Sequence, residues 1–328
     1  MTVKEIFDLR KQGKIEEAYE AIRPMYAVHQ GKYTTLCMFW TASDILKKRI
    51  KEKRFDEAEK IFKALLRVLP NIDDKDGKAR NNILYAAVTL DKEDKAFCML
   101  DFLQQLNVEQ LGDEDWKTVV TPATDGQPSH PIPSVAQQLL TCAFHEMQEQ
   151  KDGDFMAHKA PRPHDEVVDS CLKLMPMLQE AMRRYPRDKH NQRYMAVVYT
   201  VMGEREKAAA IYRQLLSRSH DSYLYAELAE LTEQPGPKAA LYCQAIINQR
   251  QEKFRTGYRL ALARLLADRD KPRAAYELKK CADTRKALGY NITHDIEQML
   301  QQLADTQPVT DAEQQDFYRR MTEKFPNK

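Results

Sequence analysis

The chain has 328 residues, and its 51 Lys and Arg residues nearly balance its 49 Asp and Glu residues, for a net charge of +2. This balance excludes neither a protein nor a nucleic acid as partner, so only a local patch of charge could indicate one. Six scattered cysteines without a C-x-x-C pair indicate reduced thiols. No stretch reaches the roughly 18 apolar residues of a membrane span, and the N-terminus lacks a leader-like pattern. We expect a cytoplasmic protein that does not enter a membrane.

Helix-forming residues dominate the chain. Gly accounts for only 10 of the 328 residues, well below its usual share of roughly 7%. The helix-forming residues Ala, Leu, Glu, Lys, Gln and Arg are abundant. Apolar residues recur at helical spacing almost throughout, which predicts about sixteen helices in antiparallel pairs. The pairs are expected at 2–12 with 15–28, 33–52 with 55–69, 76–91 with 93–106, 134–150 with 165–185, 189–218, 221–250, 253–287, and 292–304 with 310–325.

Residues 107–133 interrupt this pattern, because the Gly and Pro residues among them prevent a continuous helix. The segment is too long for a plain connector. Its Trp116 could pack back onto the helices or contact a partner, and we expect it to pack. Pro128, Pro131 and Pro133 are expected to give extended backbone that leads into the next helix.

The expected organisation is one continuous array with an irregular middle. It divides into N-terminal repeats at 1–106, an insertion at 107–164 that contains the helix at 134–150, C-terminal repeats at 165–287, and capping helices at 288–328. The capping helices have a polar outer face, which the end of a repeat array needs for solubility.

Seven short windows share one pattern, in which a turn and an acidic stretch precede an alanine, with a large apolar residue four positions later. The clearest window is 53–66, which is followed by Pro70. The other windows centre on Ala18, Ala96, Leu174, Ala208, Ala239 and Ala274. A period of thirty to forty residues is typical of stacked helical repeats, and such arrays mostly bind other molecules.

The residues around these centres resemble the tetratricopeptide repeat (TPR), a helix-turn-helix unit of about 34 residues. The second repeat supplies Ile45, Leu46, Ala58, Phe62, Leu65 and Pro70, and the fifth supplies Met195, Ala196, Tyr199, Gly203, Ala208, Tyr212 and Leu215. The resemblance covers roughly 1–106 and 165–287. It implies an all-α fold, a right-handed α-solenoid of about seven to eight TPR-like helix pairs, that serves as a scaffold or adaptor. A helical array of the HEAT type is the alternative.

Motifs for catalysis are missing from the sequence. There is no G-x-G-x-x-G, P-loop or G-x-S-x-G pattern. His145 and Glu146 begin like a zinc-protease helix, but position 149 is Glu instead of the second His. An enzyme site around His145, His158 and His164 is the weakest of the functional hypotheses. We therefore predict a protein without catalytic activity, bound metal or cofactor.

The resemblance implies that the first helix of each pair lines a concave groove. Counting back from each central Ala places a basic and aromatic set in this groove, with no acidic residue from the first three repeats. The predicted partner-binding residues are Arg10, Lys11, Trp40, Lys47, Lys51, Lys78, Asn81, Asn82, Tyr85 and Arg193. The same count adds His190 and Arg259.

Three interpretations of this set remain open. Ammonium and amide donors aimed into one groove can hold the carboxylates of an acidic protein or peptide. The same side chains could bind RNA or DNA, with phosphates at the lysines and bases stacked on the aromatics, and tether it to a catalytic partner. Alternatively, the lysines form a solvated helix face that binds nothing. We favour a protein partner with an acidic segment.

Overall fold

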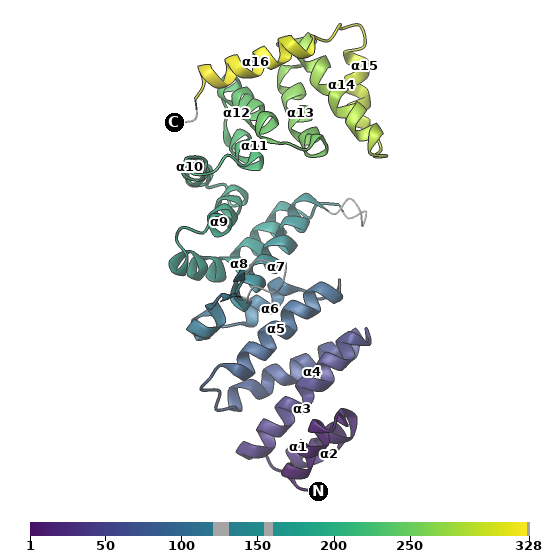
Figure 1. Ribbon diagram of the computed structural model, residues 1–328, viewed down its shortest axis with the longest axis vertical. Helices are drawn as coiled ribbons and strands as arrows, with labels where there is room; N and C mark the ends of the chain where they lie inside the picture. Colours follow the sequence, from purple (N-terminus) through teal and green to yellow (C-terminus); the bar gives the residue numbers. More distant parts are fainter. Residues whose placement is uncertain (121–130, 154–159, 327–328) are drawn as a thin grey trace, which may run out of the picture. The chain divides into compact units, whose positions relative to one another are not determined.

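The computed structural model describes residues 1–120, 131–153 and 160–326 and contains sixteen α-helices within them (Figure 1). The predicted all-α class is confirmed. The chain divides into two compact units, unit 1 at Met1–Arg184 and unit 2 at Tyr185–Lys328. Within the described ranges, no helix combines the length and the apolar character needed to cross a bilayer.

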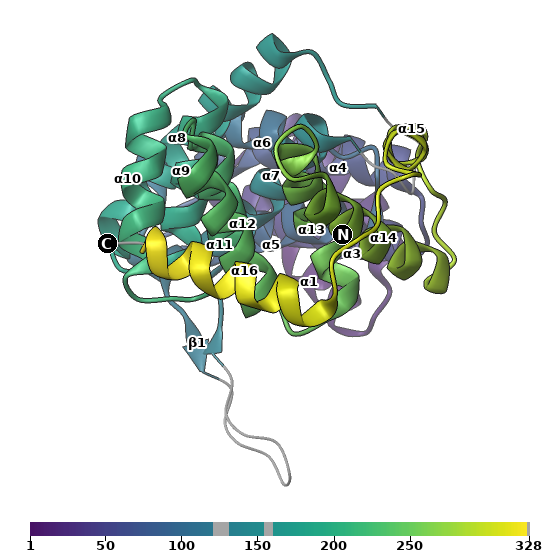
Figure 2. The same ribbon diagram turned by 90° about the horizontal axis from the view of Figure 1, so that it is seen from above.

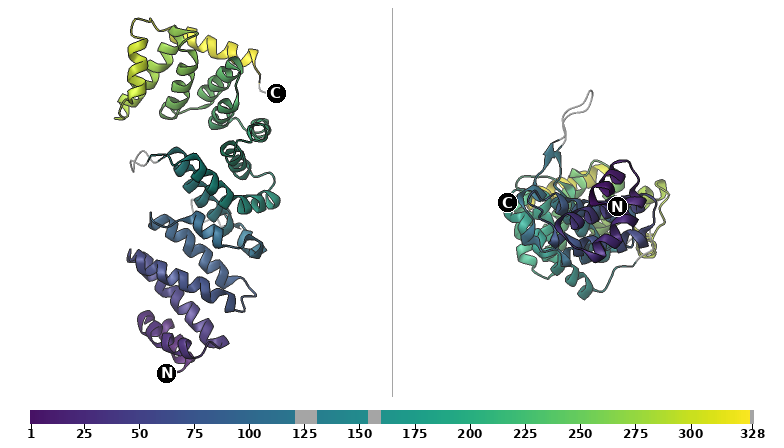
Figure 3. Two further views of the ribbon diagram at one scale, coloured as in Figure 1. Left: turned by 180° about the vertical axis from the view of Figure 1, so that it is seen from behind. Right: turned by 90° about the horizontal axis from the view of Figure 1, so that it is seen from below.

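Unit 1 is a stack of helices in which a helix packs on its neighbours in sequence and on the helix two places away, and α5 packs mainly on α3 and α7 (Figure 3). A capping box at Thr2 starts the first helix and a second capping box at Ser134 starts the seventh. Gly13 adopts a φ of +77°, which provides the turn into the second helix. The helices are α1 Val3–Lys11, α2 Ile15–Val28, α3 Lys32–Lys51, α4 Phe55–Val68, α5 Lys78–Glu93, α6 Met99–Gln105, α7 Val135–Asp152 and α8 His164–Arg184.

The small residues predicted at the helix crossings are buried in unit 1, with one exception. Ala18 and Ala58 are fully buried, and so is Leu174 in the fourth repeat. Ala96 is exposed and precedes its helix, because α6 begins at Met99 rather than near residue 93. The prediction for this helix start was wrong because the Asp94 carboxylate accepts a hydrogen bond from the Ala96 N–H and holds a turn there.

The segment after α6 is held against the helices by Trp116 and Asp115. It contains the short 3₁₀ turns η2 (Val108–Gln110) and η3 (Asp113–Trp116). The Trp116 ring is 1% exposed, which confirms the expected packing, and the Arg184 guanidinium lies 5.4 Å from its centroid. The buried Asp115 accepts hydrogen bonds from Arg80 and from the Gly112 N–H.

A two-stranded antiparallel ribbon follows, in which β1 (Val119–Val120) pairs with β2 (Pro131–Ile132) and extends away from the helices of unit 1 (Figure 2). The sequence did not predict this ribbon. The expectation of extended backbone at Pro131 agrees with its position in β2, while Pro128 lies outside the described residues.

Unit 2 is a second stack of helix pairs with a continuous apolar core. Its crossing residues Ala208, Ala239 and Ala274 are buried, as predicted. The last helix crosses α12 and contributes the buried Tyr318 to the core (Figure 1). The helices are α9 Lys189–Val201, α10 Arg205–Leu216, α11 Ser222–Leu231, α12 Pro235–Asn248, α13 Glu252–Leu266, α14 Lys271–Ala287, α15 His294–Gln302 and α16 Asp311–Lys324.

The division between the units lies after α8, whereas the sequence suggested that the C-terminal repeats begin at residue 165. The helix α8 packs on α6 and α7, which places it in unit 1. The four-segment organisation stays a prediction.

Candidate functional site

The basic residues of helix α3 lie on two different faces of the helix. Arg49 lies between neighbouring helices, where its guanidinium is 2.7 Å from Glu16 of α2 and 2.9 Å from Glu57 of α4. Lys47 and Lys51 are one turn apart on another side of α3, and both side chains are exposed. Neither ammonium has an ion-pair partner among the residues that the structure describes. The two charges are therefore available to a ligand.

Lys47 and Lys51 border a groove between α3 and α5 with a volume of about 500 Å³. Ile50 and Ala86 are almost fully buried and form its apolar floor, while the Tyr85 side chain stands 40% exposed at its edge. The full lining is Lys47, Ile50, Lys51, Asn82, Tyr85, Ala86, Thr89 and Glu93. The groove thus combines an apolar floor with two cations on the α3 side.

A second hollow of about 550 Å³ adjoins the groove, because Asn82 and Tyr85 line both. Its lining comes from α3, from the turn before α5 and the first half of α5, from the segment between α6 and α7, and from the start of α7. The lining residues are Trp40, Asp76, Gly77, Lys78, Asn81, Asn82, Tyr85, Glu114, Lys117, Val119 and Val135. We refer to the groove and this hollow together as the trough.

Asn82 lies where the two parts of the trough meet. Its Nδ2 atom is enclosed and has no hydrogen-bond partner within the described part of the chain. A buried donor without a partner costs about 1–3 kcal/mol. Asn82 therefore places an unsatisfied neutral donor next to the groove that the two lysines border.

The trough is less basic than the sequence suggested, because it also contains Asp76, Glu93 and Glu114. Lys78 lies 2.9 Å from Asp76, and Lys117 lies 3.5 Å from Glu114. These acids come from the turn before α5, the end of α5 and η3, which are positions that the count along first helices does not include. Positive charge without a partner is therefore concentrated at the α3 side of the groove.

Two more of the predicted residues are held within the protein. Arg10 forms an ion pair with Asp44 of α3, and its guanidinium lies 5.9 Å from the Trp40 ring centroid. Asn81 donates to the carboxylate of Asp115 at 3.3 Å. Lys11 is exposed on α1 and does not line the trough. Lys11 therefore lies apart from the other predicted residues of unit 1, whereas Arg10 lies against Trp40 without lining the trough itself.

The basic residues predicted in unit 2 are also engaged. Arg193 binds Glu227 of the next first helix at 2.6 Å and lies 4.9 Å from the Tyr223 ring centroid. Arg259 is buried, and its Nη1 atom is 2.7 Å from Glu277. Both residues stabilise unit 2 instead of extending a basic face.

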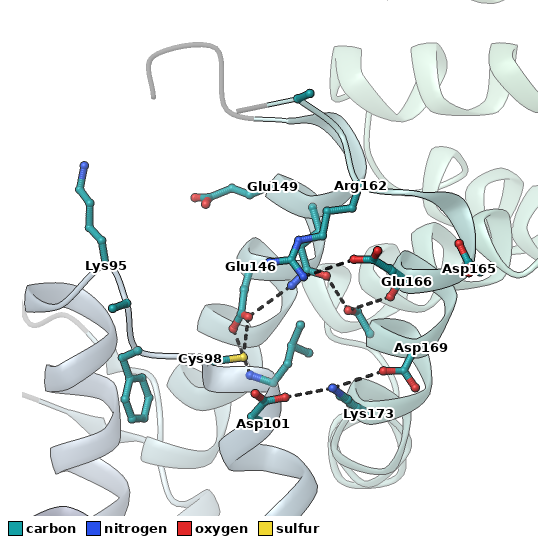
Figure 4. A pocket seen from close by; sticks show the side chains of 16 residues that line it. Lys95, Cys98, Asp101, Glu146, Glu149, Arg162, Asp165, Glu166, Asp169 and Lys173 are labelled. Atoms are coloured by element: carbon teal, nitrogen blue, oxygen red, sulfur yellow. Dashed lines mark hydrogen bonds and ion pairs between the residues drawn. The ribbon is translucent and has the colours of Figure 1, made fainter. Parts of the chain in front are cut away.

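An acidic hollow of about 670 Å³ opens where α7 and α8 meet the start of α6, and the sequence did not predict it (Figure 4). Six carboxylates and three basic side chains line it. These charged residues are Asp101, Glu146, Glu149, Asp165, Glu166, Asp169, Lys95, Arg162 and Lys173. The signal available in the sequence was a set of acids at helical spacing along 146–149 and 165–169.

Several of these acidic side chains have structural partners. Glu146 accepts from the Leu100 N–H at 3.0 Å, which caps α6, and from the Cys98 thiol at 2.9 Å. Lys173 links Asp101 and Asp169 at 2.9 and 3.3 Å, as Figure 4 shows. Burial and the nearby Glu146 carboxylate raise the pKa of the Cys98 thiol to about 12, so this cysteine is an unreactive thiol at neutral pH.

The histidines of the enzyme hypothesis do not form a site in the described residues. His145 on α7 and His164 at the start of α8 are both exposed, and His158 lies outside the described residues. No group of three His, Cys, Asp or Glu side chains converges as metal ligands in the ranges that the structure describes. Burial and Asp91 raise the pKa of Cys142, one turn before His145, to about 12.

Comparisons with known proteins find a family of unknown function and similarity to solved structures. A family described as a domain of unknown function, DUF7017, matches residues 191–324, which is less than half of the chain. None of the curated proteins matches. Among solved structures, a tetratricopeptide repeat protein from Parabacteroides merdae is similar with 14% identity and a TM-score of 0.40, over 92% of this chain and 97% of that one.

Proposed function

We propose that the protein is a non-catalytic interaction scaffold, and that the trough of unit 1 holds an acidic segment of a protein partner. The observation that carries the proposal is the position of Lys47 and Lys51. They lie one turn apart, exposed and without ion pairs among the described residues, in a groove that also presents Asn82 and Tyr85. A carboxylate there would receive charge-assisted hydrogen bonds from groups that the protein itself leaves available.

The three acids that line the trough do not pair with these lysines. Asp76 and Glu114 are paired with Lys78 and Lys117, and Glu93 lies on α5, outside ion-pair distance of Lys47 and Lys51. The positive charges of Lys47 and Lys51 on the α3 side of the groove therefore attract a negatively charged segment. We expect association to slow as salt is added, because screening weakens this steering.

A protein segment fits this arrangement better than a nucleic acid does. A nucleic acid brings a phosphate charge at every nucleotide, and a strand that followed the trough would meet Glu93 at one end and Asp76 and Glu114 at the other. An acidic protein segment can place its carboxylates at the two lysines alone. The exposed ring of Tyr85 is equally suited to an apolar side chain and to a base.

The test is capture of partners from a lysate of the host organism by the wild-type chain and by Lys47→Glu with Lys51→Glu. The double variant reverses both charges without touching the core, so we expect it to fold normally and to lose at least about 100-fold in affinity. A matched control is Lys4→Glu with Lys60→Glu, which makes the same change at two exposed lysines outside the trough.

The proposal is supported if an acidic protein is retained by the wild type and the control, lost by the trough variant, and insensitive to nuclease. Equal retention by the trough variant would remove the trough from the interaction. Loss of all partners on nuclease treatment would instead assign the trough to a nucleic acid.

A further inference from the structure

We infer that the trough recognises an internal amphipathic segment, in which one large apolar side chain lies on Ile50, Ala86 and the Tyr85 ring, and an Asp or Glu close by in sequence reaches Lys47 and Lys51. This inference rests on the proposed function and names the class of segment that the trough binds. Three features of the groove carry it: its apolar floor, the separation of its charges, and its continuation past Asn82.

The apolar floor is the first feature. Ile50 is 5% exposed and Ala86 6% exposed, so they seal the bottom of the groove, and the half-exposed Tyr85 ring forms a wall beside them. A groove built only for charge would not need this surface. Burial of a Leu-sized side chain here removes apolar area of the ligand and of the exposed Tyr85 ring from water, which is a non-directional gain that a polyanion cannot obtain.

The separation of charge is the second feature. Lys47 and Lys51 lie on α3, whereas Glu93 is the last residue of α5. A carboxylate at the Glu93 end would be repelled, so the acidic residue of the ligand must lie on the α3 side. Farther along the trough, Lys78 and Lys117 are paired with Asp76 and Glu114, so among the described residues that part offers no unpaired cation to a further acidic residue. The trough therefore selects against a long acidic run and for an acidic residue next to an apolar one.

The third feature is that the groove does not end at Asn82 and Tyr85. The trough continues from there into the second hollow, where Val119 and Val135 add apolar lining. A chain can therefore pass through the groove instead of ending in it. For this reason we assign the carboxylate to a side chain of an internal segment rather than to a chain terminus.

The experiment measures binding of short peptides with blocked termini to the full chain by fluorescence anisotropy. The first peptide has one Leu next to one Glu in a Gly and Ser background, the second has Ser in place of Leu, and the third has Gln in place of Glu. A further arm repeats the first sequence with a free C-terminal carboxylate, and another uses a polyglutamate peptide. We expect each single replacement to weaken binding at least about tenfold.

Variants of Tyr85 connect the apolar preference to the groove. Tyr85→Ala should bring the Leu peptide to the affinity of the Ser peptide while leaving the Ser peptide unchanged, and Tyr85→Phe should retain the preference. Together these measurements form a double-mutant cycle. Tyr33→Ala is the matched control, since Tyr33 is an exposed tyrosine of α3 that does not line the trough.

Each outcome decides between the two proposals. Equal binding of the Leu and Ser peptides, or tighter binding of polyglutamate, overturns the amphipathic segment but keeps the acidic partner. A strong gain from the free terminus overturns the internal segment. If no acidic peptide binds and a single-stranded oligonucleotide does, both this inference and the proposed function are wrong.

Discussion

The two units treat the basic residues of their first helices differently. In unit 2, Lys189 binds Asp221 at 2.6 Å and Arg193 binds Glu227, each across to the following first helix. In unit 1, Lys47 and Lys51 face the following first helix as well, but among the described residues they meet no carboxylate within ion-pair distance. Unit 2 pairs these charges internally, and unit 1 leaves two of them without an ion pair among the described residues.

The sequence explains the difference through the repeat length. Arg193 and Glu227 are 34 residues apart, and so are Arg10 and Asp44 of unit 1. The positions 34 residues after Lys47 and Lys51 hold Asn81 and Tyr85, which have no negative charge. Arg10 and Arg193, which have an acid one repeat later, are paired across first helices, whereas Lys47 and Lys51 have no such acid.

The largest loss of stability is expected for a substitution at the most deeply buried of these ion pairs in unit 2. Arg259 and Glu277 are 5% and 0% exposed, and Gln314 also donates to Glu277, at 2.5 Å. Arg259→Ala leaves the Glu277 carboxylate buried without its cation, which should lower the free energy of unfolding by about 3–5 kcal/mol. Denaturant unfolding measures the loss, and hydrogen exchange of α13 and α14 locates it in unit 2.

The matched control for this variant is Arg264→Ala on the same helix. Arg264 also pairs with a carboxylate, Asp295, but both side chains are about half exposed. Its removal should cost under about 1 kcal/mol. Equal losses of unfolding free energy for the two variants would show that burial does not determine how much these ion pairs stabilise the fold. The contrast between the units would then lose its physical basis.

A smaller loss of stability distinguishes a cation with an ion-pair partner from a cation without one in the described structure. Arg193→Gln removes charge-assisted hydrogen bonds to Glu227 and should lower the free energy of unfolding by about 1.5–3 kcal/mol. Lys51→Gln removes an exposed cation without an ion pair in the described structure, so the change in stability should stay within about 0.5 kcal/mol. Parallel denaturant unfolding of the two variants measures both values.

Peptide binding should show the opposite order. Lys51→Gln should weaken binding of the acidic Leu peptide, and Arg193→Gln should leave it unchanged. If Lys51→Gln instead destabilises the fold as much as Arg193→Gln does, Lys51 has a structural partner and its assignment to binding is wrong.

Most of the fold could be predicted because local patterns specify it. Apolar spacing placed α1 to α5 within one or two residues, and the small residues at helix crossings other than Ala96 are buried where the repeat pattern put them. The start of α6 was not predictable in this way. It depends on a cap from Glu146, which is 46 residues away in sequence and comes close only in the folded chain. The β1–β2 ribbon has two residues per strand, too few to give a period.

The candidate site was predicted in part for a related reason. Counting along first helices identified cations that point toward the inner face, and the structure brings Lys47, Lys51, Asn82 and Tyr85 together at one groove. The count could not tell which cations are already paired. It therefore included Arg10, although Asp44 lies one repeat later and binds it. Whether the groove binds a partner stays a prediction.

The smallest loss of stability is expected for a substitution at the contact between α2 and α3. Hydrogen bonds from Arg49 and Lys48 lower the pKa of Glu16 from 4.5 to about 2. Because the pKa is lower in the folded state, the stabilisation is complete above pH 4.5 and is lost as the pH falls toward 2. Glu16→Gln should therefore lower the free energy of unfolding at pH 7, by under about 1 kcal/mol because the Glu16 side chain is 42% exposed.

Denaturant unfolding of the wild type and of Glu16→Gln between pH 7 and pH 2 measures this dependence. The difference between the two proteins should shrink over the window from pH 4.5 to about 2, and Glu17→Gln, a change at an exposed neighbour on α2, should show no such window. A difference that stays constant down to pH 2 would mean that the Glu16 charge does not stabilise the packing of α2 on α3. In that case the sorting of basic residues on α3 would not depend on ion pairing, and availability of Lys47 and Lys51 would need another explanation.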